Sequence, residues 1–458
     1  MRLSNGRSLR IVALTAAAAA GLAACGGGGA PGTPLPAGNQ PPVTAEASAS
    51  DLVQAKLAVP AGMTEGAFEA ERTVLIPKGW SMAVFARTPS ARLAVWTPDG
   101  KMLVSRPKEG HVDVLTPNGS GPADSATLLK GLNQPHGLAF DGATLYVAES
   151  SRINAYDYAD GRATNRRTVV DGLPDEKSAD LHGQYAHALK SVAVGPDHAI
   201  YYSIGSTGNI SEEDRSASPE RAAIFRVPPG GGAPEVFARG VRNGTGLAVA
   251  PDGTVWTAVN HRDNIQFPYD TPFGEEQGSQ RGKVLDAYVA DHPAEQLAKL
   301  TPGRDLGWPY CNSDQDVQPG VAGTAYDYSE PKYVKDQELN PDGSKLDCSK
   351  LAPVEQSMGA HSAPLGLNFA TLPAPYGAGA LVGVHGSWNR QPPRAPEVSF
   401  FKYENGKMSG QKTLVGGFQG PDGKRWGRPV SATVGPDGAI YITDDSAPAV
   451  YRLAPPGK

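Results

Sequence analysis

A short pattern of strand, tight turn and strand recurs along most of this 458-residue chain. The turn carries Asp-Gly or a close variant, which tolerates the positive φ that a tight hairpin requires. Its flanks are rich in Val, Tyr and Ile, as buried antiparallel strands are. The clear copies are LAVWTPDGKMLVS (93–105), GLAFDGATLYVAE (137–149), SVAVGPDHAIYYS (191–203), GLAVAPDGTVWTA (246–258) and SATVGPDGAIYIT (431–443). A diverged copy covers 366–384, so six repeats organise the chain.

Further strand-like segments follow each pair. Third strands are expected at 112–115, 153–158, 224–227, 398–403 and 450–453. Fourth strands are expected to end in a shared apolar-x-Gly-apolar signature at 129–132, 170–173, 238–241 and 415–418. Four-stranded units repeated radially form a β-propeller. The sequence therefore predicts an all-β fold, a six-bladed β-propeller of four-stranded antiparallel blades.

The two ends of the repeat array complement each other. The last repeat stops after its third strand, at Arg452-Leu453, while the segment 83–87 near the start resembles the fourth-strand segment 235–239. We expect the N-terminal strand to supply the missing outer strand of the last blade and to close the ring, which removes the exposed sheet edges. Two packed sandwich domains are the alternative, but they would not explain this complementarity.

The composition agrees with many short strands joined by turns. The chain has 55 Gly and 41 Pro, and only 19% of its residues are charged. These values exclude a coiled coil, a disordered chain driven by charge and a helical membrane protein. The 42 basic and 47 acidic residues give a net charge of −5, so the overall charge does not point to nucleic acid.

The first 24 residues predict an export signal. Arg2, Arg7 and Arg10 form a positive start, and the apolar run 11–24 is too short to span a bilayer as a helix. The run ends in Leu-Ala-Ala before Cys25, which resembles a bacterial lipobox, so we expect an exported protein anchored to a bacterial membrane by lipid on Cys25, facing the periplasm or cell exterior. A plain secretory signal is the alternative. The predicted domains are a signal peptide (1–24), a flexible tether (25–70) and the propeller (71–458).

A long gap before the last repeat holds the diverged fifth repeat and an insertion at about 262–361. Long loops on a rigid scaffold usually carry function or cover a site. The insertion contains Cys311 and Cys348, an even pair in an oxidising compartment, so a disulfide is predicted. Two cysteines alone are too few ligands for a zinc site. We expect the insertion to form a lid or rim pinned by this disulfide.

Polar residues stand directly before the first strands of the repeats. In a propeller these positions meet at one face of the central channel, and four of them lie nine or ten residues before the turn Asp of their repeat. Singly, a histidine near a turn is more often structural, and an arginine there could bridge two blades. Together they predict a positively charged mouth that suits an anionic ligand, with imidazole as a general base. The residues are His136, His187, Arg242, Asn243, His361 and Arg428.

At these residues the sequence resembles the soluble quinoprotein sugar dehydrogenases, especially their sorbosone dehydrogenase branch. The resemblance covers about 74–453, and the order and blade positions of its motifs make the set specific. These motifs are Gln134-Pro135-His136-Gly137-Leu138-Ala139, His187 eight residues before Gly195-Pro196-Asp197, Arg242-Asn243 before Gly246-Leu247-Ala248, Asn260-His261-Arg262-Asp263, Leu306-Gly307-Trp308-Pro309-Tyr310, His385-Gly386-Ser387-Trp388-Asn389-Arg390 and Gly427-Arg428-Pro429-Val430.

The resemblance implies pyrroloquinoline quinone (PQQ) as cofactor, with a calcium ion that bridges cofactor and protein. It implies that His187 takes the proton from the substrate hydroxyl as hydride moves to the quinone, and that Arg242 also has a catalytic role because it polarises the quinone end. The implied cofactor-binding residues are Arg242, Asn243, Arg428, Arg390 and His136. The implied metal ligands are backbone carbonyls of the loop that contains His261 and Arg262.

Three departures from the glucose-oxidising members bear on the substrate. Leu189-Lys190-Ser191 replace basic or Gly-Arg residues after the histidine, Trp426 stands where an arginine is expected, and Gly244 replaces a proline. An aldose, an aldehyde or another sugar-like alcohol is therefore expected in place of glucose, and Trp426 bears on the affinity for the cofactor.

Two other function classes stay open. Calcium-dependent lactonase-type propeller hydrolases line their channels with Glu, Asp and Asn, whereas the residues here are mainly His and Arg. A non-catalytic lipoprotein that uses the propeller as a binding platform is the second alternative. The expected partners are a small sugar and an electron acceptor, with no nucleic acid and no membrane contact besides the Cys25 anchor.

Overall fold

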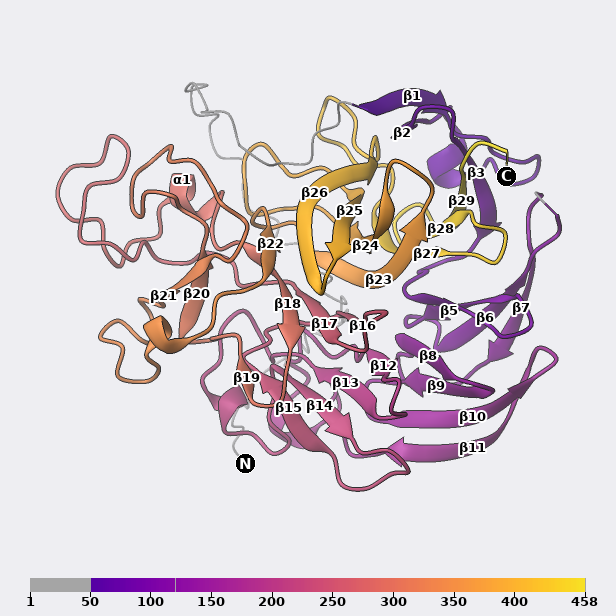
Figure 1. Ribbon diagram of the computed structural model, residues 1–458, viewed down its shortest axis with the longest axis horizontal. Coiled ribbons are helices and arrows are strands. Elements are labelled where there is room, and N and C mark those ends of the chain that lie inside the picture. Colours follow the sequence, from indigo (N-terminus) through magenta and orange to yellow (C-terminus); the bar gives the residue numbers. More distant parts are fainter. Residues whose placement is uncertain (1–50, 120, 458) are drawn as a thin grey trace, which may run out of the picture. The chain divides into compact units, whose positions relative to one another are not determined.

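Six sheets, each built on four antiparallel strands, follow one another in the computed structural model, which describes residues 51–119 and 121–457 (Figure 1). Blade 1 consists of β4 (Ala94–Trp96), β5 (Met102–Arg106), β6 (His111–Thr116) and β7 (Asp124–Leu129). Blade 2 consists of β8 (Gly137–Asp141), β9 (Thr144–Ala148), β10 (Ile153–Ala159) and β11 (Arg162–Val170). Blade 3 consists of β12 (Val192–Val194), β13 (Ile200–Ile204), β14 (Ala223–Val227) and β15 (Glu235–Arg239).

The remaining three blades complete the predicted six-bladed propeller. Blade 4 consists of β16 (Gly246–Val249), β17 (Val255–Val259), β18 (Glu295–Leu300) and β22 (Gln356–Met358). Blade 5 consists of β23 (Pro364–Leu372), β24 (Gly377–Val384), β25 (Glu397–Glu404) and β26 (Lys407–Val415). Blade 6 consists of β27 (Pro429–Val434), β28 (Ile440–Asp444), β29 (Ala449–Ala454) and β3 (Ser81–Arg87).

The ring closes as the sequence predicts. β3, near the start of the described chain, pairs antiparallel with β29, the last strand, from Arg87 opposite Ala449 to Ser81 opposite Ala454. The all-β six-bladed fold and its closure by the N-terminal strand are thus confirmed.

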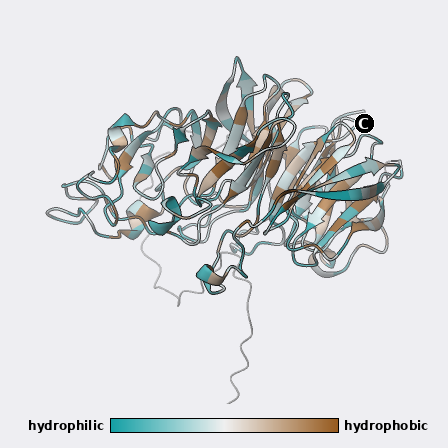
Figure 2. Cartoon of the chain, turned by 90° about the horizontal axis from the view of Figure 1, so that it is seen from below, coloured by the Kyte–Doolittle hydropathy of each residue, from teal (hydrophilic) through white to brown (hydrophobic). Residues whose placement is uncertain are grey.

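The blades are held together by apolar side chains between neighbouring sheets. The residues coloured as hydrophobic run along the strands, while the loops are mainly hydrophilic (Figure 2). Between blades 2 and 3, for example, Ile153 packs in one buried cluster with Ile200 and Phe225. The innermost strands approach very closely, since a Cβ added to Gly137 of β8 would lie 2.5 Å from the backbone nitrogen of Val192 in β12. Only glycine fits there, which explains why that inner strand begins with it.

The range expected as an insertion, about 262–361, also supplies β18 and β22 to blade 4. The extra chain therefore forms two excursions, the first excursion (260–294) between β17 and β18 and the second excursion (301–355) between β18 and β22. The first contains α1 (Asp286–Val289). The second contains β19 (Arg304–Asp305), β20 (Cys311–Asp314), β21 (Lys332–Lys335) and the short 3-10 helix η5 (Cys348–Lys350). β19 pairs in parallel with β15, which ties the second excursion to blade 3.

The tether expected over 25–70 ends earlier than predicted. β1 (Leu52–Lys56) pairs with β2 (Thr73–Pro77), and Leu57 and Phe68 are buried in a cluster with residues of blades 5 and 6. Their apolar side chains gain from burial, so this part of the chain folds onto the propeller. The signal peptide 1–24 and Cys25 lie outside the described residues.

Three further short 3-10 helices occur in loops of the described chain. They are η2 (Gly66–Phe68), η3 (Ala179–Leu181) and η4 (Glu213–Arg215). Within the ranges that the structure describes, no helix has the length and apolar character needed to cross a membrane.

Candidate functional site

Three of the sequence-predicted residues come together between blades 3 and 4. His187 lies in the loop before β12, and Arg242 and Asn243 lie in the loop before β16; all three are largely buried. Gly205, directly after β13, lies between them: a Cβ added there would be 2.6 Å from Cβ of His187 and 3.4 Å from Oδ1 of Asn243. The next residue, Ser206, donates its N–H to the Arg242 carbonyl at 2.8 Å. The shared phase of the repeats therefore does place these side chains side by side.

The surroundings of His187 fix which of its nitrogens carries the proton. Nδ1 lies 3.0 Å from the carbonyl oxygen of Ser206 and 2.9 Å from its hydroxyl oxygen. The carbonyl can only accept, and the Ser206 hydroxyl already donates to the carbonyl of Gly208 at 2.8 Å, so Nδ1–H is the donor. Nε2 then carries the lone pair. Burial, helped by the charge of Arg242, lowers the pKa of His187 to about 3, so the ring is neutral at pH 7 and can accept a proton at Nε2.

Asn209, in the loop that follows β13, positions the guanidinium of Arg242. Nε of Arg242 donates to the Asn209 carbonyl at 3.1 Å, and a second nitrogen donates to Oδ1 of Asn209 at 3.1 Å. A third hydrogen bond runs from Arg242 to the carbonyl of Asn260 at 3.0 Å. Asn209 also bonds Asp263, donating to its carbonyl at 2.9 Å and accepting its N–H at 2.7 Å. The loop after β13 and the loop after β17 are therefore joined through one amide side chain.

Asp263 is an ionised carboxylate in the same group. Its Oδ1 lies 3.2 Å from Nδ1 of His361 and accepts a hydrogen bond from Asn389 at 3.4 Å. Burial works against ionisation, but His361 and Arg242 outweigh it and lower the pKa of Asp263. On its other side, Nε2 of His361 lies 2.7 Å from the carbonyl oxygen of Val289 in α1. We call His187, Arg242, Asn243, Asn209, Asp263 and His361 the blade 3–4 group.

The loop predicted to offer carbonyl ligands to a metal is anchored on both sides. His261 donates its N–H to Glu295 at 2.6 Å, and its Nδ1 accepts the N–H of Arg262 at 2.9 Å. The guanidinium of Arg262 pairs with carboxylates of the second excursion, Asp336 at 2.6 Å and Glu338 at 3.1 Å. Nε2 of His261 is buried without a hydrogen-bond partner in the described part of the chain. Burial, together with Arg242 and Arg262, lowers the pKa of His261 to about 3.

Arg428 belongs to a second group, between blades 5, 6 and 1. Its backbone N–H donates to Asp444 at 2.9 Å, and its Nε donates to the carbonyl of His385 at 2.9 Å. Nε2 of His385 lies 2.8 Å from Asp445, which also accepts a hydrogen bond from Arg92 at 2.9 Å. Burial opposes the ionisation of Asp445, but His385 and Arg92 hold its pKa well below the usual range. We call these residues the blade 6 group.

One loop, 385–396 after β24, connects the two groups. His385 at its start belongs to the blade 6 group, whereas Asn389 reaches Asp263 of the blade 3–4 group. Arg390, a predicted cofactor partner, is next in the chain, and its guanidinium lies 3.4 Å from Asp291 of the first excursion. Trp388 of this loop is 43% exposed, which is unusual for so large an apolar side chain.

Other predicted positions turn out to be structural in their contacts. His136 has no exposed surface; its Nδ1 lies 3.2 Å from the carbonyl of Lys190, so it connects blades 2 and 3. Burial, followed by the charge of Arg92, lowers its pKa to about 3. Lys190 itself is buried and donates to the carbonyl of Pro174 at 2.9 Å. We call His136, His187 and His261 the three low-pKa histidines, because the pKa of each is lowered to about 3, mainly by burial.

Trp426, which replaces an expected arginine, packs in the apolar cluster of blades 5 and 6. Its ring lies against Phe418, with the ring centres 5.1 Å apart, and its Nε1 donates to the carbonyl of Gly417 at 2.7 Å. The preceding residue, Arg425, instead reaches the loop 385–396 and donates to the carbonyl of Ser387. A cation is thus present beside this loop, one position earlier than the resemblance predicts.

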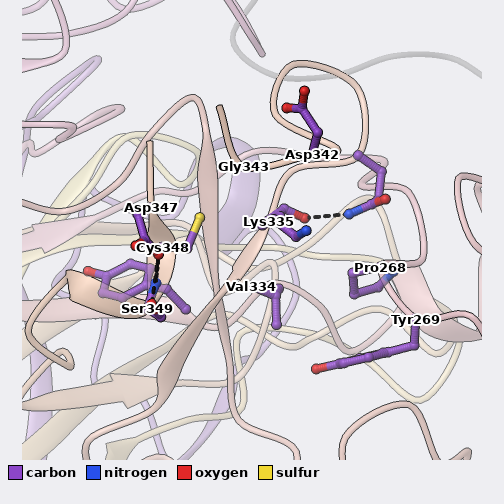
Figure 3. A pocket seen from close by; sticks show the side chains of 11 residues that line it. Pro268, Tyr269, Val334, Lys335, Asp342, Gly343, Asp347, Cys348 and Ser349 are labelled. Atoms are coloured by element: carbon purple, nitrogen blue, oxygen red, sulfur yellow. Dashed lines mark hydrogen bonds between the residues drawn. The ribbon is translucent and has the colours of Figure 1, made fainter. Parts of the chain in front are cut away.

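The predicted disulfide between Cys311 and Cys348 is confirmed, with Cα atoms 5.7 Å apart. Cys348 also lines a cavity of about 610 Å³ in the excursions (Figure 3). Pro268 and Tyr269 of the first excursion lie on one side of it and the segment of Cys348 lies on the other. None of the sequence-predicted catalytic or cofactor residues lines this cavity.

Several residues of the site carry no signal in the sequence pattern. Ser206 and Asn209 follow a second strand, where the repeats have no shared polar position, and Glu295 opens a third strand. Asp263 does stand in a motif that the sequence singles out, directly after Asn260-His261-Arg262, and His385 and Asn389 stand in the motif 385–390.

Comparisons with known proteins bear on this site. A model of the TrAA12-like family matches residues 74–455. A curated relative, the pyrroloquinoline quinone-dependent pyranose dehydrogenase of Coprinopsis cinerea, is 26% identical over 265 residues, which cover 53% of this chain and 32% of the relative. The match thus spans about a third of that relative's length. A second relative, from Borreliella burgdorferi and described only as an uncharacterized protein, is 22% identical over 85% of this chain and 93% of its own.

Solved structures share the fold. The holo form of the pyranose dehydrogenase PQQ domain from Coprinopsis cinerea is 19% identical, with a TM-score of 0.65 over 87% of this chain and 98% of that chain. The calcium structure of a Trichoderma reesei family AA12 enzyme is 20% identical, with a TM-score of 0.65 over 83% of this chain and 96% of that chain. At these identities the likeness concerns the propeller itself.

Proposed function

Because the chain belongs to the TrAA12-like family, we propose that it is a quinoprotein oxidoreductase that oxidises a sugar or a sugar-derived alcohol or aldehyde, with PQQ as cofactor. The observation that carries this proposal is the neutral imidazole of His187, whose Nε2 lone pair lies in the same group as the cation of Arg242 and the amide of Asn243. The PQQ-dependent relative and the PQQ domain with the same fold support it.

The side chains at the mouth fit an anionic cofactor. Guanidinium groups bind carboxylates through paired N–H donors. Arg242 belongs to the blade 3–4 group and Arg428 to the blade 6 group, and the loop 385–396, which carries Arg390, contacts both groups. We assign Arg428 and Arg390 to the carboxylates of PQQ, and Arg242 and Asn243 to its quinone end. The carbonyls of His261 and Arg262, together with the ionised Asp263, offer the oxygen ligands that calcium prefers.

When bound, PQQ would supply the acceptor for a hydride, which carries both electrons of the oxidation. The residues of the chain then have three tasks. His187 accepts the proton of the substrate hydroxyl at Nε2, and Ser206 holds the ring in the tautomer that permits this. Arg242 places positive charge where negative charge develops, and Asn209 keeps that guanidinium in place.

The substrate we propose is sorbosone-like or aldose-like. Trp388 offers an exposed indole in the loop 385–396, and the apolar face of a sugar ring packs well on such a surface. Electrons would then pass to an external acceptor. Anchoring through lipid on Cys25, and thus action outside the cytoplasm, belongs to the same proposal.

The test is reconstitution of the purified protein with PQQ and Ca²⁺, followed by addition of single sugars and sugar aldehydes. We expect a quinone absorbance that substrate bleaches, and loss of bleaching in His187→Ala while PQQ still binds. His198→Ala is the matched control, because this histidine is exposed at a blade turn. Failure to bind PQQ at saturating Ca²⁺ would overturn the proposal, as would full bleaching by His187→Ala. Hydrolysis of lactones without PQQ would instead identify the hydrolase alternative.

A further inference from the structure

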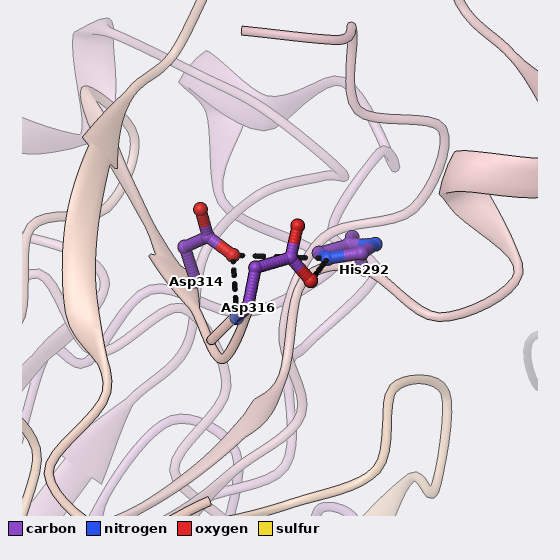
Figure 4. A group of neighbouring side chains, drawn as sticks. All are labelled: His292, Asp314 and Asp316. Carbon is purple, nitrogen blue, oxygen red and sulfur yellow. Dashed lines mark hydrogen bonds and ion pairs between the residues drawn. The ribbon is translucent and has the colours of Figure 1, made fainter. Parts of the chain in front are cut away.

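Three side chains of the two excursions meet in a buried cluster whose role the proposed function leaves open (Figure 4). His292 follows α1 in the first excursion, while Asp314 ends β20 and Asp316 lies two residues further in the second excursion. Nε2 of His292 lies 3.0 Å from Oδ1 of Asp316 and 3.7 Å from Oδ1 of Asp314. The side chains of all three are at most 4% exposed.

The hydrogen bonds of His292 require a cation at its second nitrogen. Nδ1 lies 2.9 Å from the carbonyl of Tyr288, which can only accept, so Nδ1 carries a hydrogen. In the neutral ring Nε2 then has a lone pair, and it faces two carboxylates that also offer only lone pairs. Such an arrangement is stable only with a proton or a metal ion between these atoms.

Two unpartnered oxygens indicate that a single proton does not complete the cluster. Oδ2 of Asp316 and the hydroxyl of Tyr288 are buried, and no described residue forms a hydrogen bond with either. The Tyr288 ring is stacked on the His292 ring with their centres 4.0 Å apart, so it belongs to the same cluster. A buried charged oxygen without a partner is costly. Two carboxylates and one proton would also leave a net negative charge, whereas a divalent cation neutralises both.

The residues around the cluster are arranged as in protein metal sites. Histidines that bind metals commonly donate their other N–H to a backbone carbonyl, as His292 does to Tyr288, and ligating carboxylates are themselves hydrogen-bonded. Here the hydroxyl of Tyr269 donates to Oδ2 of Asp314, and the N–H of Asp316 donates to Oδ1 of Asp314 at 3.0 Å. These bonds fix the orientation of both the imidazole and the carboxylate.

We propose that His292, Asp314 and Asp316 bind a divalent transition-metal ion of the zinc class. Tetrahedral ligands at about 2.0 Å from zinc stand about 3.3 Å apart, and the two distances from Nε2 of His292, 3.0 and 3.7 Å, bracket that value. An imidazole ligand suits zinc and its neighbours, whereas calcium prefers oxygen ligands alone. This site therefore differs in chemistry from the calcium site proposed at the 260–262 loop, and it does not rest on the proposed function.

Such an ion would join the two excursions at the point where they contact the candidate site. Three residues before His292, the carbonyl of Val289 lies 2.7 Å from His361, and the neighbouring Asp291 pairs with Arg390 at 3.4 Å. The metal would thus fix the position of the segment 289–292, which contacts His361 and Arg390 of the candidate site.

The experiment measures metal binding on the protein without PQQ or sugar. The protein is stripped with a chelator, dialysed into excess Ca²⁺ to fill oxygen-ligand sites, and titrated with Zn²⁺ while elemental analysis and the melting temperature are recorded. We expect one Zn²⁺ per chain and a higher melting temperature, with at least about 100-fold weaker binding in Asp316→Asn and His292→Gln. Glu276→Gln, an exposed carboxylate of the first excursion, is the control and should bind as the wild type does.

Cobalt provides a readout that does not depend on the folding of a variant. Co²⁺ added to the stripped wild-type protein should give the visible absorbance of a four- or five-coordinate site, and Zn²⁺ should displace it. Absence of a stoichiometric ion together with an unchanged melting temperature would overturn the proposal and leave His292 as an imidazolium between the two carboxylates. Because neither readout uses PQQ, this failure is distinguishable from failure of the proposed function.

Discussion

Ser206→Ala tests how the chain prepares His187 for proton transfer. The wild-type ring has two acceptors at Nδ1, the carbonyl of Ser206 at 3.0 Å and its hydroxyl at 2.9 Å. The substitution removes the hydroxyl and keeps the carbonyl, so the tautomer with its lone pair on Nε2 is retained. What is lost is the contribution of one hydrogen bond to the orientation of the ring.

The expected loss in rate is therefore small. A hydrogen bond of this kind contributes about 0.5–1.5 kcal/mol, which corresponds to a decrease in kcat/KM of about 2- to 13-fold. Removal of the base itself, in His187→Gln, should cost about 100- to 10,000-fold. Both variants should leave the affinity for PQQ nearly unchanged, because neither side chain is assigned to the cofactor.

The assay is steady-state oxidation by the reconstituted protein between pH 5 and 8, with a dye as electron acceptor. Because the pKa of His187 is lowered to about 3 by burial and by Arg242, the imidazole stays neutral across this range in both proteins. We therefore expect no titration of His187 in the profile of either the wild type or Ser206→Ala. A loss above about 100-fold in Ser206→Ala, or a new acidic limb near the ordinary histidine pKa, would refute this account of the tautomer.

Four further outcomes are expected. Gly137→Ala should destabilise the protein by about 1–3 kcal/mol, because the new Cβ would lie 2.5 Å from the backbone nitrogen of Val192; urea unfolding measures this, and no loss would contradict the close approach of the inner strands. Cys311→Ser should lower the free energy of unfolding by about 2–4 kcal/mol, since the bond to Cys348 closes a loop with a sequence separation of 37; equal urea midpoints of the two proteins would refute it. Trp388→Ala should raise KM for sugars several-fold more than it lowers kcat, and the reverse split would argue against sugar stacking. The three low-pKa histidines have folded pKa values of about 3 against 6.5 for an ordinary histidine, so the unfolded chain binds more protons between these values and stability falls as the pH falls through this window. Glu295 and Asp444, whose pKa values burial raises to about 7 and about 6, oppose this effect until their unfolded forms are also protonated; the melting temperature should therefore fall most steeply below about pH 4.5.

The blades follow from the sequence because each depends on a local signal. An Asp-containing turn between two runs rich in β-branched and aromatic residues specifies a hairpin without help from distant parts of the chain. Blades 4 and 5 depart from this pattern. The turn between the first two strands of blade 5, at 373–376, contains no Asp. In blade 4 the third strand, β18, reads EQLAKL and the outer strand, β22, has only three residues, so neither stands out from the excursions that surround it.

The tether predicted over 25–70 is too long for a related reason. The segment before Thr73 is short, and its fold depends on two apolar side chains, Leu57 and Phe68, that are buried by residues from the other end of the chain. A contact of this kind has no local signature. Composition therefore indicated a linker where tertiary packing produces a strand.

The candidate site is predictable only where the repeat sets its phase. His187 and Arg242 both lie ten residues before the turn Asp of their repeats and Asn243 lies nine before, so the three residues meet at the same end of blades 3 and 4. His136 lies only five residues before Asp141 of its repeat, so it does not share this phase, and it is buried between blades. The phase determines which end of the blade a residue occupies, whereas its side-chain direction depends on neighbours such as Lys190.

The pairing of β3 with β29 has a consequence for the order of folding. These strands come from opposite ends of the described chain, so β3 leaves the ribosome early and waits for its partner until nearly the whole chain has been made. Until then its backbone groups are unpaired, and blade 6 lacks one of its four strands. Because contacts so distant in sequence form slowly, we expect ring closure to be the last step of folding and the stage at which the chain is most exposed to aggregation.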